Sequence, residues 1–143
     1  QAQWREQVQA LVVSSIGQVR RGDRLTAALR SLDELEARFA MLSIEGDTVR
    51  QRFDCARRCL ETRNLIQVAR MLATAALMRE ESRGGHFRLD FPTQDDARFR
   101  RNIIVRNEKG KVAAELRDVP DGAATAAPPP GAVSTCASVA VPA

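Results

Sequence analysis

Aromatic side chains are scarce in this chain of 143 residues, which has no tyrosine, one tryptophan and five phenylalanines. Strands usually depend on aromatic and β-branched residues, so this scarcity argues against a β-sandwich and favours a helical core of Leu, Ile, Val, Ala and Met. There is also no apolar run of about 18 residues, so we expect neither a transmembrane helix nor a membrane partner.

Residues that build catalytic or metal sites are rare as well. His86 is the only histidine, and the three cysteines, Cys55, Cys59 and Cys136, have no regular spacing. Zinc needs four such ligands, and serine-based catalysis would need a histidine base other than this single one. The odd cysteine count favours reduced thiols in a reducing, cytoplasmic compartment. Without a glycine-rich dinucleotide loop or a phosphate loop, we expect no catalytic, cofactor or metal site in this chain.

Positive charge is in only mild excess, because 22 basic and 18 acidic side chains give a net charge of +4. Arg98, Arg100 and Arg101 form a small cluster. A nucleic-acid interface would need a longer basic stripe with aromatic residues on which bases stack. The sequence has no such stripe, so we expect no nucleic-acid partner.

Apolar residues recur in three segments at the three- and four-residue spacings of amphipathic helices. We expect these helices over residues 3–21, 23–41 and 48–82. Gly22 is a predicted helix stop, while Asp23 and Asp47 are predicted N-caps. Between residues 65 and 78 the third helix is apolar on most sides. Either another domain or subunit covers the excess surface, or this is a well-buried central helix.

After the helices we expect an extended segment, a hairpin and a tail. Residues 102–106 and 111–117 are strand candidates around a turn at 107–110, and such a hairpin needs a surface to lie against. From Pro120 onward, small residues and proline dominate and cannot offset the entropy of ordering. The predicted fold is all-α: a three-helix bundle resembling a spectrin repeat in 1–96, a short extension with a possible hairpin in 97–119, and a disordered tail in 120–143.

The most unusual stretch runs from Arg79 to Pro92 and gathers three arginines, one histidine and three carboxylates at a predicted helix end. Gly84 and Gly85 end the helix and let the backbone turn sharply. Apolar and polar residues then alternate, which is typical of an extended segment with one apolar side.

Two roles fit this stretch. Arg83 and Arg88 could grip an external anion such as a carboxylate, or they could form internal ion pairs with Glu81 or Asp90. The dipole of a helix C-terminus disfavours anions and favours arginine and protonated histidine, so we prefer the structural or interdomain role. The candidate residues for that role are Arg79, Glu81, Ser82, Arg83, Gly84, His86, Arg88 and Asp90.

These residues also carry a resemblance to a known family. Residues 81–92 match every fixed position of the run E-S-R-G-x-H-x-R-x-D-[FY]-P, which is typical of the C-terminal domain of L-aspartate oxidases. That domain is shared with the flavoproteins of fumarate reductase and succinate dehydrogenase. Arg20, in the sequence I-G-Q-V-R, resembles the arginine of the family's V-G-x-x-R element. The resemblance covers roughly residues 4–96.

The resemblance implies a three-helix bundle that packs on the flavin-binding and capping domains of the same polypeptide. The whole enzyme would oxidise L-aspartate to iminoaspartate with FAD, in the de novo NAD (quinolinate) pathway. The family's substrate-binding arginines and histidines lie in those other domains. We therefore carry no catalytic residue over to this chain, and we expect FAD to be bound only in the full-length enzyme.

The choice of the oxidase over its relatives rests on the residues after the motif. The relatives usually continue with a Trp-x-Lys-His segment, whereas residues 95–100 contain neither Trp nor a Lys-His pair. Two alternatives stay open. One is the same domain of a fumarate reductase or succinate dehydrogenase flavoprotein, and the other is a free-standing helical module that binds a helix or peptide.

Overall fold

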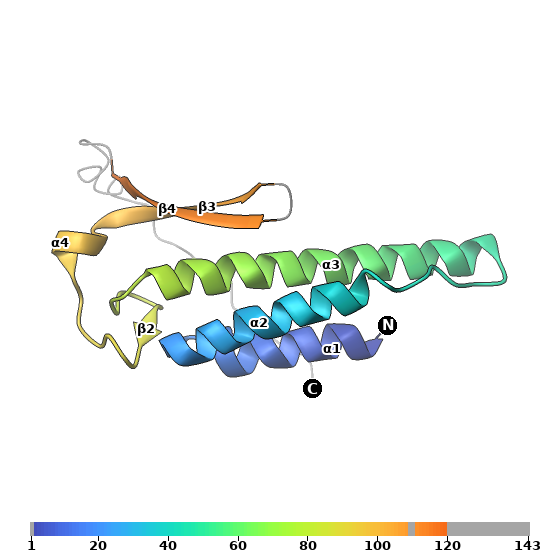
Figure 1. Cartoon of the computed structure of the whole chain (residues 1–143), viewed down its shortest axis with the longest axis horizontal. Coiled ribbons are helices and arrows are strands. Elements are labelled where there is room, and N and C mark those ends of the chain that lie inside the picture. The colour runs from blue at the N-terminus through green and yellow to red at the C-terminus, as the bar shows by residue number, and fades with distance from the viewer. Residues whose placement is uncertain (1, 109–110, 120–143) are drawn as a thin grey trace, which may run out of the picture.

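A computed structural model describes residues 2–108 and 111–119 and shows a mainly helical chain that ends in a small hairpin, as predicted (Figure 1). In chain order the elements are α1 (Ala2–Leu11), the π-helix η1 (Val12–Ile16), β1 (Val19–Arg20), α2 (Gly22–Phe39), α3 (Val49–Met78), β2 (Phe87–Arg88), α4 (Asp96–Phe99), β3 (Arg101–Glu108) and β4 (Lys111–Asp118). The predicted disordered tail, 120–143, lies outside the described residues. None of the helices described is long and apolar enough to cross a membrane.

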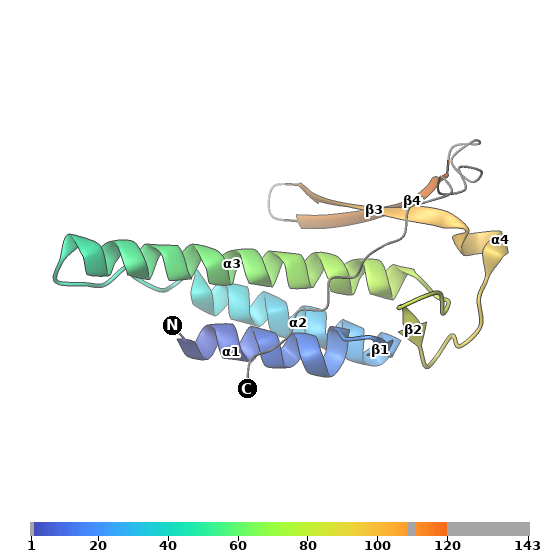
Figure 2. The ribbon, with the colours of Figure 1, turned by 180° about the vertical axis from the view of Figure 1, so that it is seen from behind.

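The three long helices lie side by side, and α3 extends beyond the other two (Figures 1 and 2). Their shared core consists of apolar side chains at helical spacing, and α3 contributes mostly small ones, which allows α2 to approach closely. The buried core residues are Val8, Ile16, Leu25, Ala28, Leu32, Leu35, Ile66, Ala69, Ala73 and Ala76. The finer likeness to a spectrin repeat stays a prediction.

The first helix is shorter than predicted. It leaves α-geometry after Leu11, continues as η1, and stops before Gly17, which has the non-helical dihedrals φ −51° and ψ −155°. The Arg20 Nε donates a hydrogen bond to the carbonyl of Ile16 at 3.0 Å and so caps this end. The residues predicted to continue the helix form β1 instead, which pairs with β2 in parallel, Val19 opposite Phe87.

The start of α2 corrects two further predictions. Gly22 does not stop a helix but is the first residue of α2. Asp23 is not the N-cap, because its carboxylate binds the Arg21 guanidinium and the Arg24 backbone N–H. The N–H of Gly22 instead donates to the Asp90 carboxylate at 3.0 Å. A residue 68 positions away therefore supplies the partner that a local cap would otherwise provide.

Both ends of α3 also differ from the prediction. Thr48, not Asp47, is the N-cap: its hydroxyl accepts from the Gln51 N–H, and the Gln51 side chain accepts from the Thr48 N–H in return. This reciprocal pair is a capping box. The helix ends at Met78 rather than near Ser82, since the next residue already has an extended conformation.

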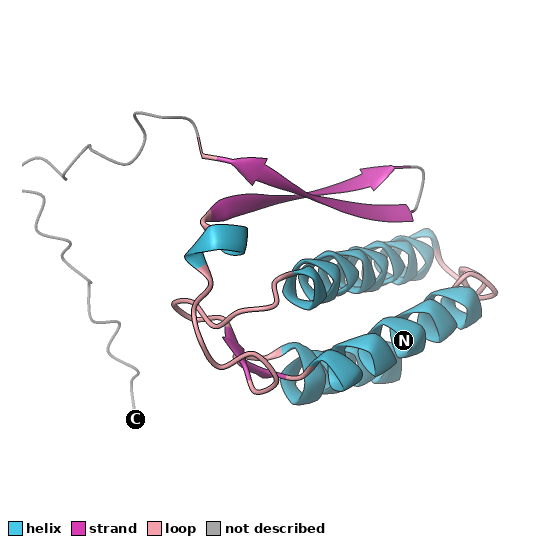
Figure 3. Ribbon diagram, turned by 60° about the vertical axis from the view of Figure 1, so that its left-hand side comes forward, coloured by secondary structure: helices cyan, strands magenta, loops and turns pink. Residues whose placement is uncertain are grey.

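The predicted hairpin is present and lies along α3 (Figures 1 and 3). β3 and β4 are antiparallel, with Arg101 opposite Asp118 and Glu108 opposite Lys111. Alternate residues of β4 are partly buried, which fits a strand with one side against a helix. The hairpin explains in part why α3 is apolar on most sides, because helices cover one side and strands another. Val68 and Leu72 nevertheless remain about half exposed, at 52% and 51%.

Candidate functional site: an arginine–carboxylate network at one end of the helices

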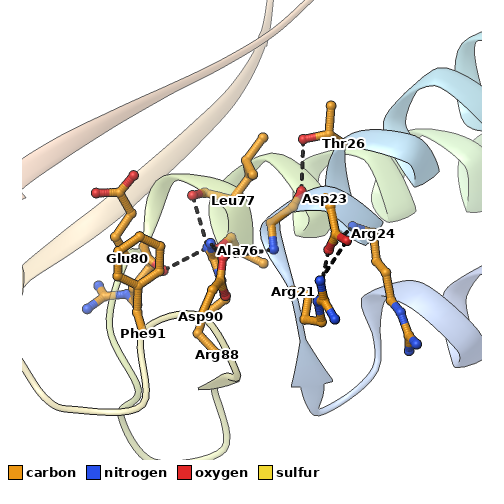
Figure 4. Close-up of polar contacts among 12 residues, drawn as sticks. Arg21, Asp23, Arg24, Thr26, Ala76, Leu77, Glu80, Arg88, Asp90 and Phe91 are labelled. Atoms are coloured by element: carbon orange, nitrogen blue, oxygen red, sulfur yellow. Dashed lines mark hydrogen bonds and ion pairs between the residues drawn. The ribbon is translucent and has the colours of Figure 1, made fainter.

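The segment 79–92 folds back across the C-terminal end of α3 and brings the predicted charged residues together. Arg88 is its centre and is 2% exposed. Its guanidinium binds the Asp90 carboxylate through two hydrogen bonds, from Nε at 2.8 Å and Nη2 at 2.7 Å. Its third nitrogen, Nη1, donates to the carbonyls of Ala76 at 2.8 Å, Leu77 at 3.1 Å and Arg79 at 3.2 Å (Figure 4).

These carbonyls are ones that the end of a helix leaves without partners. A cation at a helix C-terminus is also favoured by the helix dipole. Arg88 therefore caps α3 with its charge as well as with its hydrogen bonds. It explains why α3 stops where it does, since a continued helix would need the same carbonyls for its own N–H groups.

Asp90 completes this link at the start of α2. Its carboxylate faces Arg88 on one side and accepts the Gly22 N–H on the other. The hydrogen bonds from Arg88 hold the pKa of Asp90 well below its usual range, and the Gly22 N–H adds to the effect against the opposing influence of burial. One ion pair thus joins the positive end of α2 to the negative end of α3.

Gly22 is required by this close approach rather than by a turn. A Cβ atom at this position would lie 2.9 Å from the Asp90 Oδ2 and 3.0 Å from the Arg88 Nη2. Both of those atoms are held by the paired hydrogen bonds, so they have little freedom to move aside.

A second buried carboxylate, Glu81, is fully enclosed, with 0% exposure. Its Oε1 accepts from the Arg79 Nη1 at 2.5 Å and the Arg83 Nε at 2.9 Å. Its Oε2 accepts from the Arg83 Nη2 at 3.1 Å and the Asp95 backbone N–H at 2.9 Å. Arg83 also contacts Asp96, so it bridges two acidic residues.

Burial alone would raise the pKa of Glu81, but the hydrogen bonds from Arg83, the Asp95 N–H and Arg79 outweigh it and lower that pKa to about 2. The folded state therefore favours the ionised carboxylate. Its contribution to stability is present above pH 4.5, the usual pKa of the group, and disappears as the pH falls toward 2.

Arg79 connects this network to the hairpin. Besides Glu81, its guanidinium donates to the carbonyl of Phe99 at 3.0 Å and to that of Arg101 at 2.9 Å. The segment therefore fixes two junctions: Arg88 joins α2 to α3, and Arg79 joins α3 to α4 and the first residue of β3.

Ser82 and Gly84 shape the turn that carries these side chains. The Ser82 hydroxyl accepts the Arg88 N–H at 2.9 Å and donates to the Phe91 carbonyl at 2.8 Å. Gly84 has a φ of +57°, a conformation that costs little only for glycine. The backbones of Arg83 and His86 exchange two hydrogen bonds across this glycine turn.

His86 is held neutral. Its Nδ1 faces the Arg20 Nη1, and its Nε2 lies 3.1 Å from the Arg79 carbonyl. Since a guanidinium can only donate, Nδ1 must accept and Nε2 must carry the proton. Burial lowers the pKa of His86, and Arg20, Arg88 and Arg79 lower it further despite the hydrogen bond to the carbonyl. Burial and the nearby arginines thus oppose the protonated form that the helix dipole would favour.

The network settles how the two strongest arginine candidates are used within the chain. Arg83 pairs with Glu81 and Arg88 with Asp90, which are the internal ion pairs that the sequence predicted. Arg88 is too buried to grip an external anion. The sequence did not predict that Gly22 and Asp95 belong to the network. Each donates a backbone N–H to one of its carboxylates, and a backbone group leaves no side-chain pattern in the sequence.

The extended segment after the turn buries its polar side. Arg88 is buried, while Phe87 and Leu89 on the apolar side are 41% and 52% exposed. Val19, the partner of Phe87 in the parallel pair, is 59% exposed. An apolar strip therefore faces outward beside a buried charge network.

The described residues contain no cluster of three or more side chains that could hold a metal ion. Cys55 and Cys59 lie one turn apart on α3 in the thiol form, and burial raises the pKa of Cys59, with a further contribution from Cys55. The glycines at 84 and 85 follow the end of a helix, whereas a dinucleotide-binding glycine loop leads from a strand into a helix N-terminus. The donor set here thus fits a structural joint between helix ends.

Comparison with known proteins shows which family resembles this chain. Residues 5–131 match the family described as fumarate reductase flavoprotein C-term. An L-aspartate oxidase of Streptomyces coelicolor is 37% identical over 117 residues, which cover 80% of this chain and 19% of the oxidase. A fumarate reductase flavoprotein subunit of Mycobacterium tuberculosis is 36% identical over 104 residues, 73% of this chain and 18% of the subunit. The chain thus spans about a fifth of the length of these relatives.

Solved structures agree. A quinol-fumarate reductase with menaquinol molecules superposes with a TM-score of 0.75 at 28% identity and covers 82% of this chain and 21% of its own. A Mycobacterium smegmatis Sdh1 in complex with UQ1 gives a TM-score of 0.68 at 30% identity, covering 77% of this chain and 19% of its own. In both, the similar region is a minor part of a much longer flavoprotein-related chain.

Proposed function

Since this chain belongs to the fumarate reductase flavoprotein C-terminal family, we propose that it is the C-terminal helical domain of an L-aspartate oxidase. The intact enzyme would oxidise L-aspartate to iminoaspartate with FAD, in de novo NAD (quinolinate) biosynthesis. In this proposal the chain carries no catalytic group. It packs on the flavin-binding and capping domains of the same polypeptide, without a nucleic-acid or membrane partner, in the cytoplasm.

The observation that carries the choice of the oxidase is the segment after the motif. Residues 95–100 contain neither the Trp nor the Lys-His pair that the other flavoproteins usually have. In the structure this segment is bound to the charge network, since the Asp95 N–H donates to Glu81 and the Asp96 carboxylate pairs with Arg83. The match to the Streptomyces coelicolor oxidase, which covers 80% of this chain, supports the same choice.

The network supports a structural and interdomain role for its eight residues. Their charges are largely spent on partners inside the chain, which suits a rigid joint better than a substrate site. The outward-facing Phe87 and Leu89 support a contact with the missing domains, because exposed apolar strips usually mark interaction surfaces. We also propose that the helical domain ends near residue 96 and that the extension after it ends near residue 119.

The decisive experiment uses the full-length polypeptide with FAD bound. It should produce hydrogen peroxide from L-aspartate in the presence of oxygen. A matched reaction with succinate and an artificial electron acceptor serves as control, since it reports the dehydrogenase chemistry of the relatives. Peroxide production that requires L-aspartate supports the oxidase, and turnover of succinate alone contradicts it.

The alternative is the same domain of a fumarate reductase or succinate dehydrogenase flavoprotein. A specific observation favours it, namely 36% identity to the Mycobacterium tuberculosis fumarate reductase subunit over 73% of this chain. It predicts fumarate reduction by the full-length protein with a reduced dye as electron donor. It also predicts no peroxide from L-aspartate above the level of a flavin-only blank.

A further inference from the structure

A basic cavity of about 390 Å³ lies at the root of the hairpin, beside the buried network. Six of the residues around it offer nitrogen donors: Arg79, Arg83, His86, Arg100, Arg101 and Asn102. The remaining lining is apolar, and within the described part of the chain no carboxylate lines the cavity. A hollow with donors and positive charge on its walls attracts anions.

Most of this positive charge is already paired. Arg79 and Arg83 share Glu81, and the Arg101 Nε lies 2.7 Å from the Asp118 carboxylate. Arg83 also pairs with Asp96. These arginines can therefore shape the wall but have little charge left for an additional ligand.

Arg100 differs from the other arginines. Its backbone N–H donates to the Asp96 carbonyl, but its guanidinium forms no ion pair or hydrogen bond with any residue in 2–108 or 111–119. It lowers the pKa of Asp96 only as a minor influence, after the hydrogen bonds from Arg83 and Gln94. That carboxylate already has Arg83 as its ion-pair partner. Among the described residues, Arg100 is thus an exposed cation on the cavity wall without an ion-pair partner.

We propose that this cavity receives a carboxylate side chain from the flavin-bearing part of the same polypeptide, with Arg100 as its principal partner. Guanidinium groups bind carboxylates with two parallel hydrogen bonds, and Asn102 adds a neutral donor beside it. The inference rests on the proposed function, since it requires a flavin-bearing part joined to this chain.

A protein carboxylate suits the cavity better than a free anion. An exposed guanidinium holds a small ion weakly, because water and salt screen the pair. Val119 on the cavity wall is 39% exposed. The partly exposed Phe87 belongs to β2, which lies at the same end of the molecule as α4 and the start of β3 (Figure 1). Apolar contacts around a complementary charge are the usual composition of a protein interface.

The test compares two charge reversals in the full-length polypeptide, Arg100→Glu and Arg30→Glu. Arg30 is an exposed arginine of α2 and matches the change in charge. Limited proteolysis between the two parts reports how often they separate. We expect Arg100→Glu to speed cleavage about threefold to tenfold, as for a lost interdomain charge pair. We expect Arg30→Glu to cleave at the unsubstituted rate.

Two further measurements test the same contact: cleavage at raised NaCl concentration and thermal melting of the isolated chain. Added NaCl should speed cleavage of the unsubstituted polypeptide but not of Arg100→Glu, which has already lost the pair. The 143-residue chain alone should melt at the same temperature with and without Arg100→Glu, since the guanidinium has no partner among residues 2–108 and 111–119. A fall in that melting temperature equal to the full-length effect would overturn the inference, because the role would then lie within the chain.

The other outcomes separate the inference from the proposed function. Equal cleavage of Arg100→Glu and Arg30→Glu would overturn the carboxylate contact and leave docking intact. Two parts of the unsubstituted polypeptide that separate freely at low salt would contradict the proposed function itself. Sodium succinate tests whether the cavity binds a free carboxylate instead. A saturable shift of the His86 NMR signals, with no effect of Arg100→Glu on cleavage, would show that the carboxylate does not come from the protein and would overturn the inference.

Discussion

At the scale of single residues, this protein buries charges and surrounds each with partners. Arg88 and Glu81 are almost completely enclosed, and each makes hydrogen bonds through every atom that carries its charge. Such pairs gain little stability over a well-packed apolar core, but removing one member leaves an uncompensated buried charge or orphaned carbonyls. We therefore expect a large loss of stability when one of these residues is replaced and its partners remain buried.

Arg88→Ala should destabilise the chain by about 3–5 kcal/mol, because it leaves Asp90 and three helix-end carbonyls without their donor. This is a large part of the stability of a typical domain, roughly 5–15 kcal/mol. Urea unfolding measures the loss. Arg98→Ala is the control, since the Arg98–Glu80 pair is exposed and should contribute less than about 1 kcal/mol. Equal losses in the two variants would contradict the assigned role of Arg88.

His86 should make stability depend on pH in a window that no other side chain of this sequence shares. Its folded pKa is lowered from an unfolded value of 6.5, so its contribution is fully present above pH 6.5 and is lost as the pH falls through the folded pKa. Free Asp and Glu carboxyl groups titrate lower, near pH 4. The unfolding free energy from urea titrations should therefore decrease between pH 7 and pH 5.

His86→Gln provides the control for this prediction, because glutamine keeps an acceptor and a donor but does not titrate. The slope between pH 7 and pH 5 should flatten in this variant. The chain has only one histidine, so the difference between the two slopes belongs to that residue. An identical slope in both proteins would show that His86 is not buried among arginines as described.

At the scale of whole elements, the helix ends are held by residues that lie far away in the sequence. The start of α2 is closed by Asp90 and the end of α3 by Arg88, so one ion pair serves two helices. The starts of α3 and α4 have local caps instead, from Thr48 and Asp95. The relative position of α2 and α3 at this end therefore depends on the segment 79–92 folding back correctly.

Gly22→Ala should lower stability by about 1–2 kcal/mol, because the added Cβ meets the bound Asp90 and Arg88 side chains. The same substitution should cost less when Asp90→Ala is already present, since the space is then free. A double-mutant cycle by urea unfolding measures that coupling, expected above about 0.5 kcal/mol. Gly85→Ala is the control and should change little, because nothing lies within 4 Å of its added Cβ. Strict additivity would refute the close-contact explanation.

The cap of α3 gives a second prediction at this scale. Thr48→Ala removes one half of the capping box and should cost about 1 kcal/mol. Asp47→Ala, one residue earlier, should stay within about 0.5 kcal/mol. Thermal unfolding followed by circular dichroism compares the two. The reverse order would restore Asp47 as the cap.

At the scale of the whole molecule, the chain resembles one domain of much longer relatives. It matches about a fifth of the length of its relatives, and it leaves apolar residues exposed at the end where the charge network lies. The hairpin covers one side of α3 but leaves Val68 and Leu72 half exposed. These surfaces are what we expect a neighbouring domain to cover.

Arg83→Ala in the full-length protein should loosen the contact between this domain and the flavin-bearing part. Arg83 bridges Glu81 and Asp96, so its loss relaxes the turn that presents the interface. We expect the melting temperature to fall by several degrees or the flavin content to drop after gel filtration. Arg57→Ala, which breaks an exposed pair on α3, is the control. Unchanged stability and flavin content would count against the interdomain role.

Local patterns in the sequence determined a good deal. Helical spacing of apolar residues located three helices, and two short apolar strands around a turn located the hairpin. The charged run at 79–92 suggested that Arg83 and Arg88 pair with Glu81 or Asp90, without fixing which arginine pairs with which acid. The run at 81–92 was specific enough to indicate the family. These features depend on neighbours along the chain, where propensity and periodicity act directly.

The tertiary structure alone decided where α2 begins and where α3 ends, and which side of the extended segment is buried. Gly22 begins a helix because Asp90, 68 residues away, accepts its N–H, and α3 stops because Arg88 takes its last carbonyls. Arg88 faces inward despite its polar character because those carbonyls and Asp90 replace the hydrogen bonds that it would make to water. Such choices depend on distant groups meeting in space, and a local sequence pattern contains no record of that meeting.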